Sequence, residues 1–327
     1  MTNERVNKAL DASRHLLTHY LQVQQNGCKR LWCFCDPGRK WMADALVTAG
    51  QEMGLVAYQT VLPSGQYSEA DLQPIAQLLP LLDEQDLVLS VFSGGIERQL
   101  PYFRIFPNLR SPANYRGFSG VIRQRYPDEM LLTHLMTDPA AVQTRVAYGQ
   151  SFDGKTVRVT APGGTDLTLQ LNRGFSLPFL AATQSRHAFL PPAEYTLGVV
   201  PGSANGRIVA DVTVGELAIN SELVDLLGLV DEPVMLDVVD GYIVNVSGGE
   251  IARRFRKHLF SLDQSARLVV ELGLGLSVGT PTGAIGADEC LQGTCHFGIG
   301  DDFFYGRQNP APIHHDSVLR DPTITII

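Results

Sequence analysis

The chain has 327 residues, of which 44% are hydrophobic and 18% are charged. This length exceeds the usual size of one domain, so we expect two domains with a sizeable core in each. The 34 acidic and 26 basic side chains leave a formal net charge of −8, which argues against a nucleic-acid partner. No apolar segment reaches the roughly 18 residues of a membrane-spanning helix, and the N-terminus lacks the apolar core of a signal peptide. Five cysteines, an odd number, indicate reduced thiols in a cytoplasmic protein. Because no apolar segment is long enough to span a membrane, no membrane partner is expected.

The first half alternates between helical and strand patterns. Helices are expected over 4–24, 39–53 and 68–82, and strands over 30–37, 55–62 and 87–94. This alternation predicts an α/β domain with a parallel sheet over residues 1–150. Cys33 and Cys35 alternate along the first apolar run, which favours a buried strand over a metal-binding knuckle.

The pattern changes after about residue 100. Residues 100–135 are irregular and rich in Arg, Tyr, Phe and Pro, and a helix is expected from Pro139. Beyond it, a Gly-Gly turn within 155–171 predicts a hairpin. Further strands are expected over 207–214, 234–246 and 267–276, and a helix over 248–261. We therefore predict an α+β domain over 151–327 that is rich in antiparallel strand pairs and carries the functional site.

Candidate metal ligands gather in the stretch that begins at Glu271. Glu271 lies within an apolar strand pattern, where a carboxylate needs a cation or a hydrogen-bond partner. His314 and Asp316 are two residues apart, so an extended segment directs both side chains to one face. Together with His296 they form a donor set that Zn²⁺, Mn²⁺, Co²⁺ or Fe²⁺ favours.

Each of these residues also has an ordinary structural interpretation. A single strand glutamate is often paired with an arginine, and His315 fits a side chain that faces solvent. The remaining helical and loop histidines are expected to be surface or core residues: His15, His19, His134 and His258.

Five short runs resemble, in order, the M29 metallo-aminopeptidases (the aminopeptidase T group). They are PGGTDLTLQL, LPPAEYT, VELGLG, ADECLQGTCHFGIGDD and IHHD. The resemblance covers about residues 150–320. It implies an M29-like fold, with an α/β N-terminal domain and a C-terminal α+β domain that holds two metal ions, and it implies a homodimer.

The resemblance also implies roles for individual residues. The implied metal ligands are Glu194, Glu271, His296, His314 and Asp316. Ala193 stands where that family has a glycine before its first glutamate. Phe303 stands where its metal-site tyrosine is expected, and the nearest tyrosine is Tyr305. Glu289 matches the family pattern as a residue that orients a ligand.

The 2,5-dihydroxypyridine ring-cleaving dioxygenases are similar to the same family. They hold one Fe²⁺ with two histidines and one carboxylate. A histidine is expected at the position that here carries Glu271, and a carboxylate there favours hydrolysis instead. His187 fits an acid or base in either scheme, and equally a structural role.

Three functions therefore remain open. The leading hypothesis is an aminopeptidase-like hydrolase that cleaves a peptide or small amide with two Zn, Co or Mn ions. In this scheme Glu194 is general base, Tyr305 and His187 assist, and the substrate lies between the domains near residues 100–135. The second is a mononuclear Fe(II) dioxygenase. The third is a non-catalytic peptide-binding relative in peptide natural-product biosynthesis, towards which Ala193 and Phe303 point.

Overall fold

The structure is a computed structural model that describes residues 3–62, 69–93, 117–122, 126–176, 179, 186–220, 222–306 and 308–327. The expected substrate wall within 100–135 lies largely outside the described residues. The chain divides into two compact units, one formed by Met1–Pro139 and Leu177–Pro192, the other by Ala140–Ser176 and Ala193–Ile327. This division departs from a single boundary near residue 150, because the chain returns to the first unit before it completes the second.

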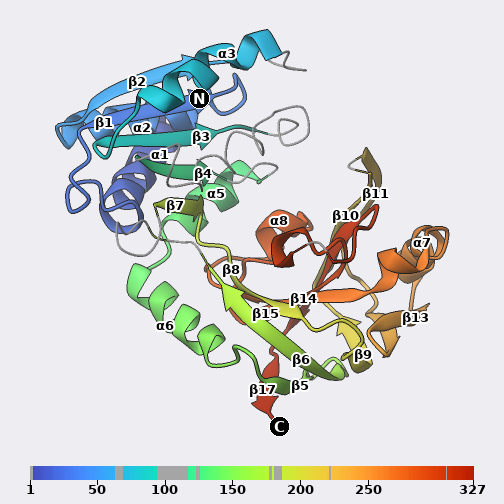
Figure 1. The fold of residues 1–327 in the computed structure, drawn as a ribbon. Coiled ribbons are helices and arrows are strands. Elements are labelled where there is room, and N and C mark those ends of the chain that lie inside the picture. Colours follow the sequence, from blue (N-terminus) through green and yellow to red (C-terminus); the bar gives the residue numbers. More distant parts are fainter. Residues whose placement is uncertain are drawn as a thin grey trace. The chain divides into compact units, whose positions relative to one another are not determined.

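The first unit contains a parallel sheet with strand order β2-β1-β3-β4-β7 (Figure 1). Its strands are β1 (Arg30–Cys35), β2 (Val56–Val61), β3 (Asp86–Val91), β4 (Phe118–Ile122) and β7 (His187–Leu190). Its helical elements are α1 (Asn3–His15), η1 (Leu16–Tyr20), α2 (Lys40–Glu52), α3 (Glu69–Leu78), η2 (Leu79–Leu81) and α5 (Asp128–Leu135). Every residue of the inner strand β3 is buried, as its apolar run predicts for a strand inside a parallel sheet.

The expected α/β character of this unit is confirmed. Cys33 and Cys35 are both buried in β1, so the strand interpretation of this pair is also confirmed. Strands β4 and β7 were not predicted, because both are short and lie beside irregular sequence.

The second unit contains an antiparallel sheet of twelve strands. Along the main path the order is β11-β10-β16-β15-β14-β8-β6-β9-β12-β13, and β5 pairs with β6 and β17. The strands are β5 (Thr156–Thr160), β6 (Asp166–Phe175), β8 (Glu194–Val199), β9 (Asn205–Ala210), β10 (Thr213–Ile219), β11 (Glu222–Leu229), β12 (Val234–Val239), β13 (Tyr242–Ser247), β14 (Val269–Gly275), β15 (Thr294–Gly300), β16 (His314–Arg320) and β17 (Thr323–Ile326). The helical elements are α6 (Pro139–Gln150), α7 (Glu250–Leu259), η3 (Gln264–Arg267), α8 (Ile285–Asp288) and η4 (Phe303–Tyr305).

The predicted single strand over 234–246 is instead a hairpin of β12 and β13. Asp240 and Gly241 form its turn, with φ angles of 48° and 83°. Two successive positive φ angles at an Asp-Gly pair are typical of a tight hairpin turn. The Asp-Gly signal was present in the sequence, and the apolar residues on both sides of it obscured the break.

Helix α7 lies on one face of the antiparallel sheet. The Phe255 ring of α7 packs against the His315 ring of β16, with centroids 4.6 Å apart. Because strand residues alternate between faces, the neighbours His314 and Asp316 point to the opposite face. That opposite face carries the candidate metal site.

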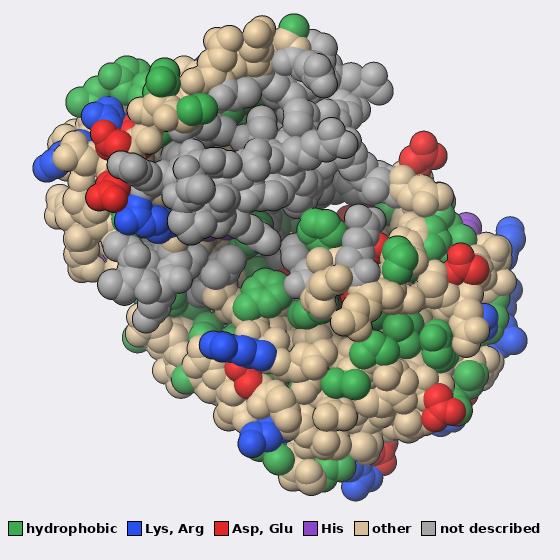
Figure 2. Space-filling view, viewed as in Figure 1, with side chains coloured by type: hydrophobic (Ala, Val, Ile, Leu, Met, Phe, Trp, Pro, Cys, Tyr) green, Lys and Arg blue, Asp and Glu red, His purple; other side chains and the backbone are tan. Residues whose placement is uncertain are grey.

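Side chains of both signs are interspersed with apolar ones on the face shown in Figure 2. None of the helices among the described residues is long and apolar enough to cross a membrane.

Candidate metal centre

Four neighbouring strands, β8, β14, β15 and β16, supply the predicted ligands. Glu271 pairs with Gly198 on one side and Gly298 on the other, and Gly298 pairs in turn with Asp316. Residues that are directly opposite in a sheet share a face, as do residues two apart in one strand. The register therefore places all five candidates on one face: Glu194, Glu271, His296, His314 and Asp316.

Glycines beside the candidates make the room that these side chains occupy. A Cβ atom on Gly273 would lie 2.0 Å from Nε2 of His296, so the imidazole covers this glycine directly. A Cβ atom on Gly298 would lie 2.8 Å from Cβ of Glu271 and 3.0 Å from Oδ1 of Asp316. Side chains at these glycines would displace the cluster, which explains the glycine-rich sequence around it.

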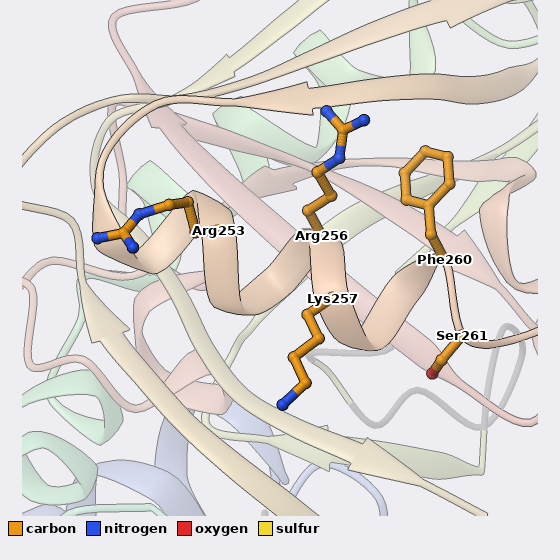
Figure 3. Close-up of a pocket in the computed structure, with 5 residues that line it drawn as sticks. All are labelled: Arg253, Arg256, Lys257, Phe260 and Ser261. Carbon is orange, nitrogen blue, oxygen red and sulfur yellow. The ribbon is translucent and has the colours of Figure 1, made fainter.

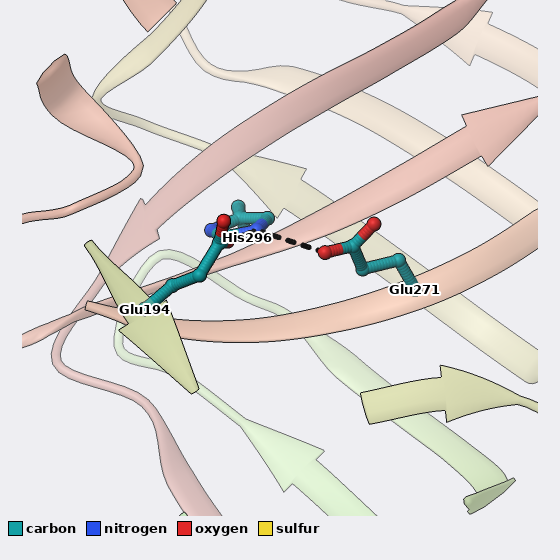
Figure 4. Close-up of side chains that lie close together, drawn as sticks. All are labelled: Glu194, Glu271 and His296. Atoms are coloured by element: carbon teal, nitrogen blue, oxygen red, sulfur yellow. Dashed lines mark ion pairs between the residues drawn. The ribbon is translucent and has the colours of Figure 1, made fainter. Parts of the chain in front are cut away.

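The five side chains form two groups that share one residue. One group is Glu194, Glu271 and His296, and the other is Glu271, His314 and Asp316; in each, the ligand atoms lie within 4.8 Å of one another. Nε2 of His296 lies 2.9 Å from Oε2 of Glu194 and 3.7 Å from Oε1 of Glu271 (Figure 4). Nε2 of His314 lies 3.2 Å from Oε2 of Glu271 and 3.6 Å from Oδ1 of Asp316. Each Glu271 oxygen thus faces a different group.

The carboxylates of the cluster favour positively charged groups beside them. Burial lowers the pKa of His296, but Glu194 and Glu271 outweigh this effect and raise it well above the usual histidine range. Burial likewise lowers the pKa of His314, but Asp316 and Glu271 raise it overall to about 10. In the metal-free protein, protons on the two imidazoles therefore offset only part of the charge of the three carboxylates. A divalent cation at either group would replace such a proton.

The hydrogen bonding of Asp316 and His314 also suits a bound metal ion. Within the described part of the chain, Oδ1 of Asp316 is buried and makes no hydrogen bond. In that part of the chain this oxygen has only the His314 ion pair at 3.6 Å. A buried carboxylate oxygen without a hydrogen-bond donor is costly, and a cation satisfies it. Nδ1 of His314 lies 2.7 Å from the carbonyl oxygen of Asp301, a contact that holds the ring with Nε2 towards the cluster, as is common for metal-bound histidines.

The side chains of the cluster differ in their exposure to solvent. The side chain of His296 is only 1% exposed, whereas those of Glu194 and His314 are 16% and 30% exposed. His296 therefore forms the floor of the site, and a substrate would approach past the two more exposed residues.

Tyr305, not Phe303, reaches the cluster. The Tyr305 hydroxyl is hydrogen-bonded to Oγ1 of Thr196, which in turn is hydrogen-bonded to Oε1 of Glu271. Burial and the charge of Glu271 raise the pKa of Tyr305 well above its usual value, so this phenol keeps its proton. The Phe303 side chain is 47% exposed. Thr196 was not predicted as part of the site, because threonine is common in strands.

Two other predicted residues have different surroundings. His187 lies on β7 in the first unit, and its Nδ1 lies 2.7 Å from the Ser119 hydroxyl. This contact supports its structural interpretation, and its role as an acid or base stays a prediction. Glu289 is buried just after α8, and its role in orienting a ligand also stays a prediction.

A depression on α7 is a different feature from the cluster. Arg253, Arg256, Lys257, Phe260 and Ser261 line it (Figure 3). None of them is a candidate ligand. Since α7 packs on His315, behind the sheet face that carries the ligands, the depression does not open onto the cluster.

Comparison with known proteins assigns the family. The family model described as NicX, 2,5-dihydroxypyridine 5,6-dioxygenase, matches residues 37–326. The chain belongs to the NicX family. No curated protein sequence matches it significantly.

Two solved structures share the fold of this NicX family member. The 2,5-dihydroxypyridine dioxygenase of Pseudomonas putida KT2440 aligns with a TM-score of 0.68 and 16% identity, over 97% of this chain and 93% of that one. AmpT from Thermus thermophilus, an M29 aminopeptidase, aligns with a TM-score of 0.57 and 14% identity, over 98% of this chain and 97% of that one. The expected M29-like fold is thus confirmed. The family model matches the dioxygenase branch, which was the second of the functions expected from the sequence.

Proposed function

We propose that this NicX family member is a two-metal hydrolase that cleaves a peptide or small amide bond. The observation that carries the proposal is the position of Glu271, whose two oxygens face two separate ligand groups. A carboxylate shared between two groups fits a bridge between two cations. A single iron held by two histidines and one carboxylate would need both imidazoles in one group, and here each group contains one.

The residues of the cluster would have two kinds of role, metal binding and proton transfer. Glu194, Glu271 and His296 would hold one cation, and Glu271, His314 and Asp316 the other. Bound there, the cations would lower the pKa of water and polarise a carbonyl group. Glu194, which is partly exposed, would take a proton from water as the oxygen adds to the carbonyl carbon. It would return that proton to the nitrogen as the carbon–nitrogen bond breaks.

The NicX family match favours a second candidate, an Fe(II)-dependent ring-cleaving dioxygenase. In this case one iron would need His296, His314 and Asp316 as ligands, which requires the two imidazoles to come together from the separate groups that share Glu271. The same fold and the same three residues serve both candidates, so the number and identity of the metal ions separate them.

The test combines metal analysis with two assays. For the hydrolase we expect about two Zn, Co or Mn ions per chain by elemental analysis, with release of N-terminal residues from a mixed peptide set. Glu194→Gln should reduce that rate about 10²- to 10⁴-fold, while the surface variant Asp166→Asn should not. One iron per chain, with oxygen uptake on a hydroxylated pyridine and no peptide cleavage, would overturn the proposal. Peptide binding without any bound metal would select the non-catalytic alternative.

A further inference from the structure

Thr196 occupies a central place in the cluster although its side chain is not a usual metal ligand. It lies on β8 between Glu194 and Gly198, pairs with Gly273 of β14, and is 5% exposed. Its single hydroxyl contacts both Oε1 of Glu271 and the Tyr305 hydroxyl. A buried hydroxyl with two polar partners has a defined hydrogen-bond pattern.

The direction of these hydrogen bonds follows from the proton count. Glu271, in contact with two imidazoles, is a carboxylate and only accepts hydrogen bonds. Thr196 therefore donates its one proton to Glu271 and accepts the proton of Tyr305. The result is a directed relay of hydrogen bonds from Tyr305 through Thr196 to Oε1 of Glu271, and the Tyr305 hydroxyl also lies within hydrogen-bonding reach of Glu271 itself.

These hydrogen bonds restrain the terminal side-chain torsion of Glu271. The terminal torsion of a glutamate has a broad energy minimum, so rotation of the carboxylate about it costs little. In the structure, Oε1 of Glu271 faces Thr196 and His296, and Oε2 faces His314. The hydrogen bond from Thr196 opposes the rotation that would take both oxygens away from their groups.

Tyr305 is itself held in place. A Cβ atom on Gly198 would lie 2.7 Å from the Tyr305 ring, so the ring covers this glycine. The Phe175 ring lies on another side, with centroids 6.0 Å apart. The phenol is thus positioned to donate to Thr196.

We propose that Thr196 is a positioning residue that fixes the carboxylate of Glu271 across two metal positions, with Tyr305 as the outer donor and not as a metal ligand. This inference rests on the two-metal function proposed above. It assigns Thr196 to the metal centre, and it gives Tyr305 a different role from the one that the family resemblance implies.

The test measures metal binding, independently of turnover. Apo-protein is titrated with Co²⁺, and the stoichiometry and both affinities are read from the visible absorption and from calorimetry. The variants are Thr196→Val, which keeps the shape and removes the hydroxyl, Thr196→Ser, which keeps the hydroxyl, and Tyr305→Phe. Thr165→Val is the matched control, because Thr165 is a buried threonine of the same unit that contacts Val209 and none of the cluster.

We expect two Co²⁺ ions in the wild type and a loss of about 10- to 100-fold in the weaker affinity in Thr196→Val. Thr196→Ser should restore the wild-type value, and Tyr305→Phe should lose less than Thr196→Val. Cu²⁺-loaded protein should show no charge-transfer band from a tyrosinate. If Thr196→Val does not fold, the weaker Co²⁺ affinity is compared between Thr196→Ala, which lacks the hydroxyl, and Thr196→Ser, which keeps it.

Wild-type affinities in Thr196→Val, or an equal loss in Thr196→Val and Thr196→Ser, would overturn the positioning role and leave the two-metal function standing. A larger loss in Tyr305→Phe, or a tyrosinate band, would make Tyr305 a ligand and overturn the inference in the same way. One ion in the wild type would overturn the proposed function first, and this inference with it.

Discussion

The imidazole of His296 lies directly over the backbone of Gly273, in the space that a side chain there would fill. A Cβ atom on Gly273 would be 2.0 Å from Nε2 and from Cε1 of this ring. The two residues are paired across β14 and β15, so the register of one strand pair determines both the position of a candidate ligand and the need for glycine beside it.

Gly273→Ala should displace His296 while the sheet stays folded. The added methyl group collides with the ring, and we expect metal affinity to fall about 10- to 100-fold with a cooperative thermal transition retained. Competition with a chromophoric chelator measures the affinity. Gly286→Ala is the control, because a Cβ atom there meets nothing within 4 Å. Equal affinity in the two variants would show that His296 does not bind the metal.

The shared position of Glu271 predicts a pattern among carboxylate variants. Glu271→Gln should weaken both metal positions, whereas Glu194→Gln and Asp316→Asn should each weaken one, by about 10- to 100-fold. Titration with Co²⁺ followed by elemental analysis after dialysis distinguishes the two positions. If Glu271→Gln affected only one position, Glu271 would not be the bridge.

Metal affinity should continue to rise with pH well above neutrality. The pKa of His314 is raised to about 10, so at pH 7 the metal-free protein holds a proton there that a cation must displace. Each displaced proton makes binding about tenfold tighter per pH unit, and this gain should persist from about pH 7 to 9. An ordinary histidine with a pKa near 6.5 would show a plateau over that range. Competition titrations at several pH values, corrected for protonation of the chelator, measure the slope. A plateau above pH 7 would contradict the prediction.

Asp86 should be important for the stability of the first unit. Its side chain is fully buried and accepts hydrogen bonds from Arg30, from the Trp32 indole and from the backbone of Asp83. Burial raises the pKa of Asp86, but these donors lower it overall. The stabilisation is therefore present above the carboxyl's unfolded pKa and is lost as pH falls through the lower folded value.

Asp86→Ala leaves Arg30 and Trp32 without this partner, and we expect a loss of about 3 kcal/mol in the free energy of unfolding. Urea denaturation at pH 7 measures it. Asp166→Ala, which breaks the exposed pair with Arg158, is the control and should be close to the wild type. A loss in Asp86→Ala no larger than in the control would show that the buried pair contributes little.

Much of the fold could be read from periodicity. The helices and strands of the first 94 residues lie close to their predicted ranges, because buried parallel strands are nearly continuous apolar runs. The start of β16 agrees with the extended segment expected at His314 and Asp316, whereas strands β8 and β15 were not predicted, because functional residues and glycines interrupt their alternation. Tertiary pairing with neighbours outweighs the weak local preference there.

The ligand types were recognisable in the sequence for a chemical reason: a glutamate in an apolar strand and a His-x-Asp pair both need a cation or a polar partner. Glu194 was different, since only the family resemblance pointed to a residue so far upstream. Its approach to His296 arises when β8 pairs with β14. The contact of Thr196 with Glu271 and Tyr305 likewise exists only in the folded sheet. Local sequence decides which metal-ligand side chains are available. Strand register, a long-range property, decides which of these side chains meet and which oxygen of Glu271 faces each group.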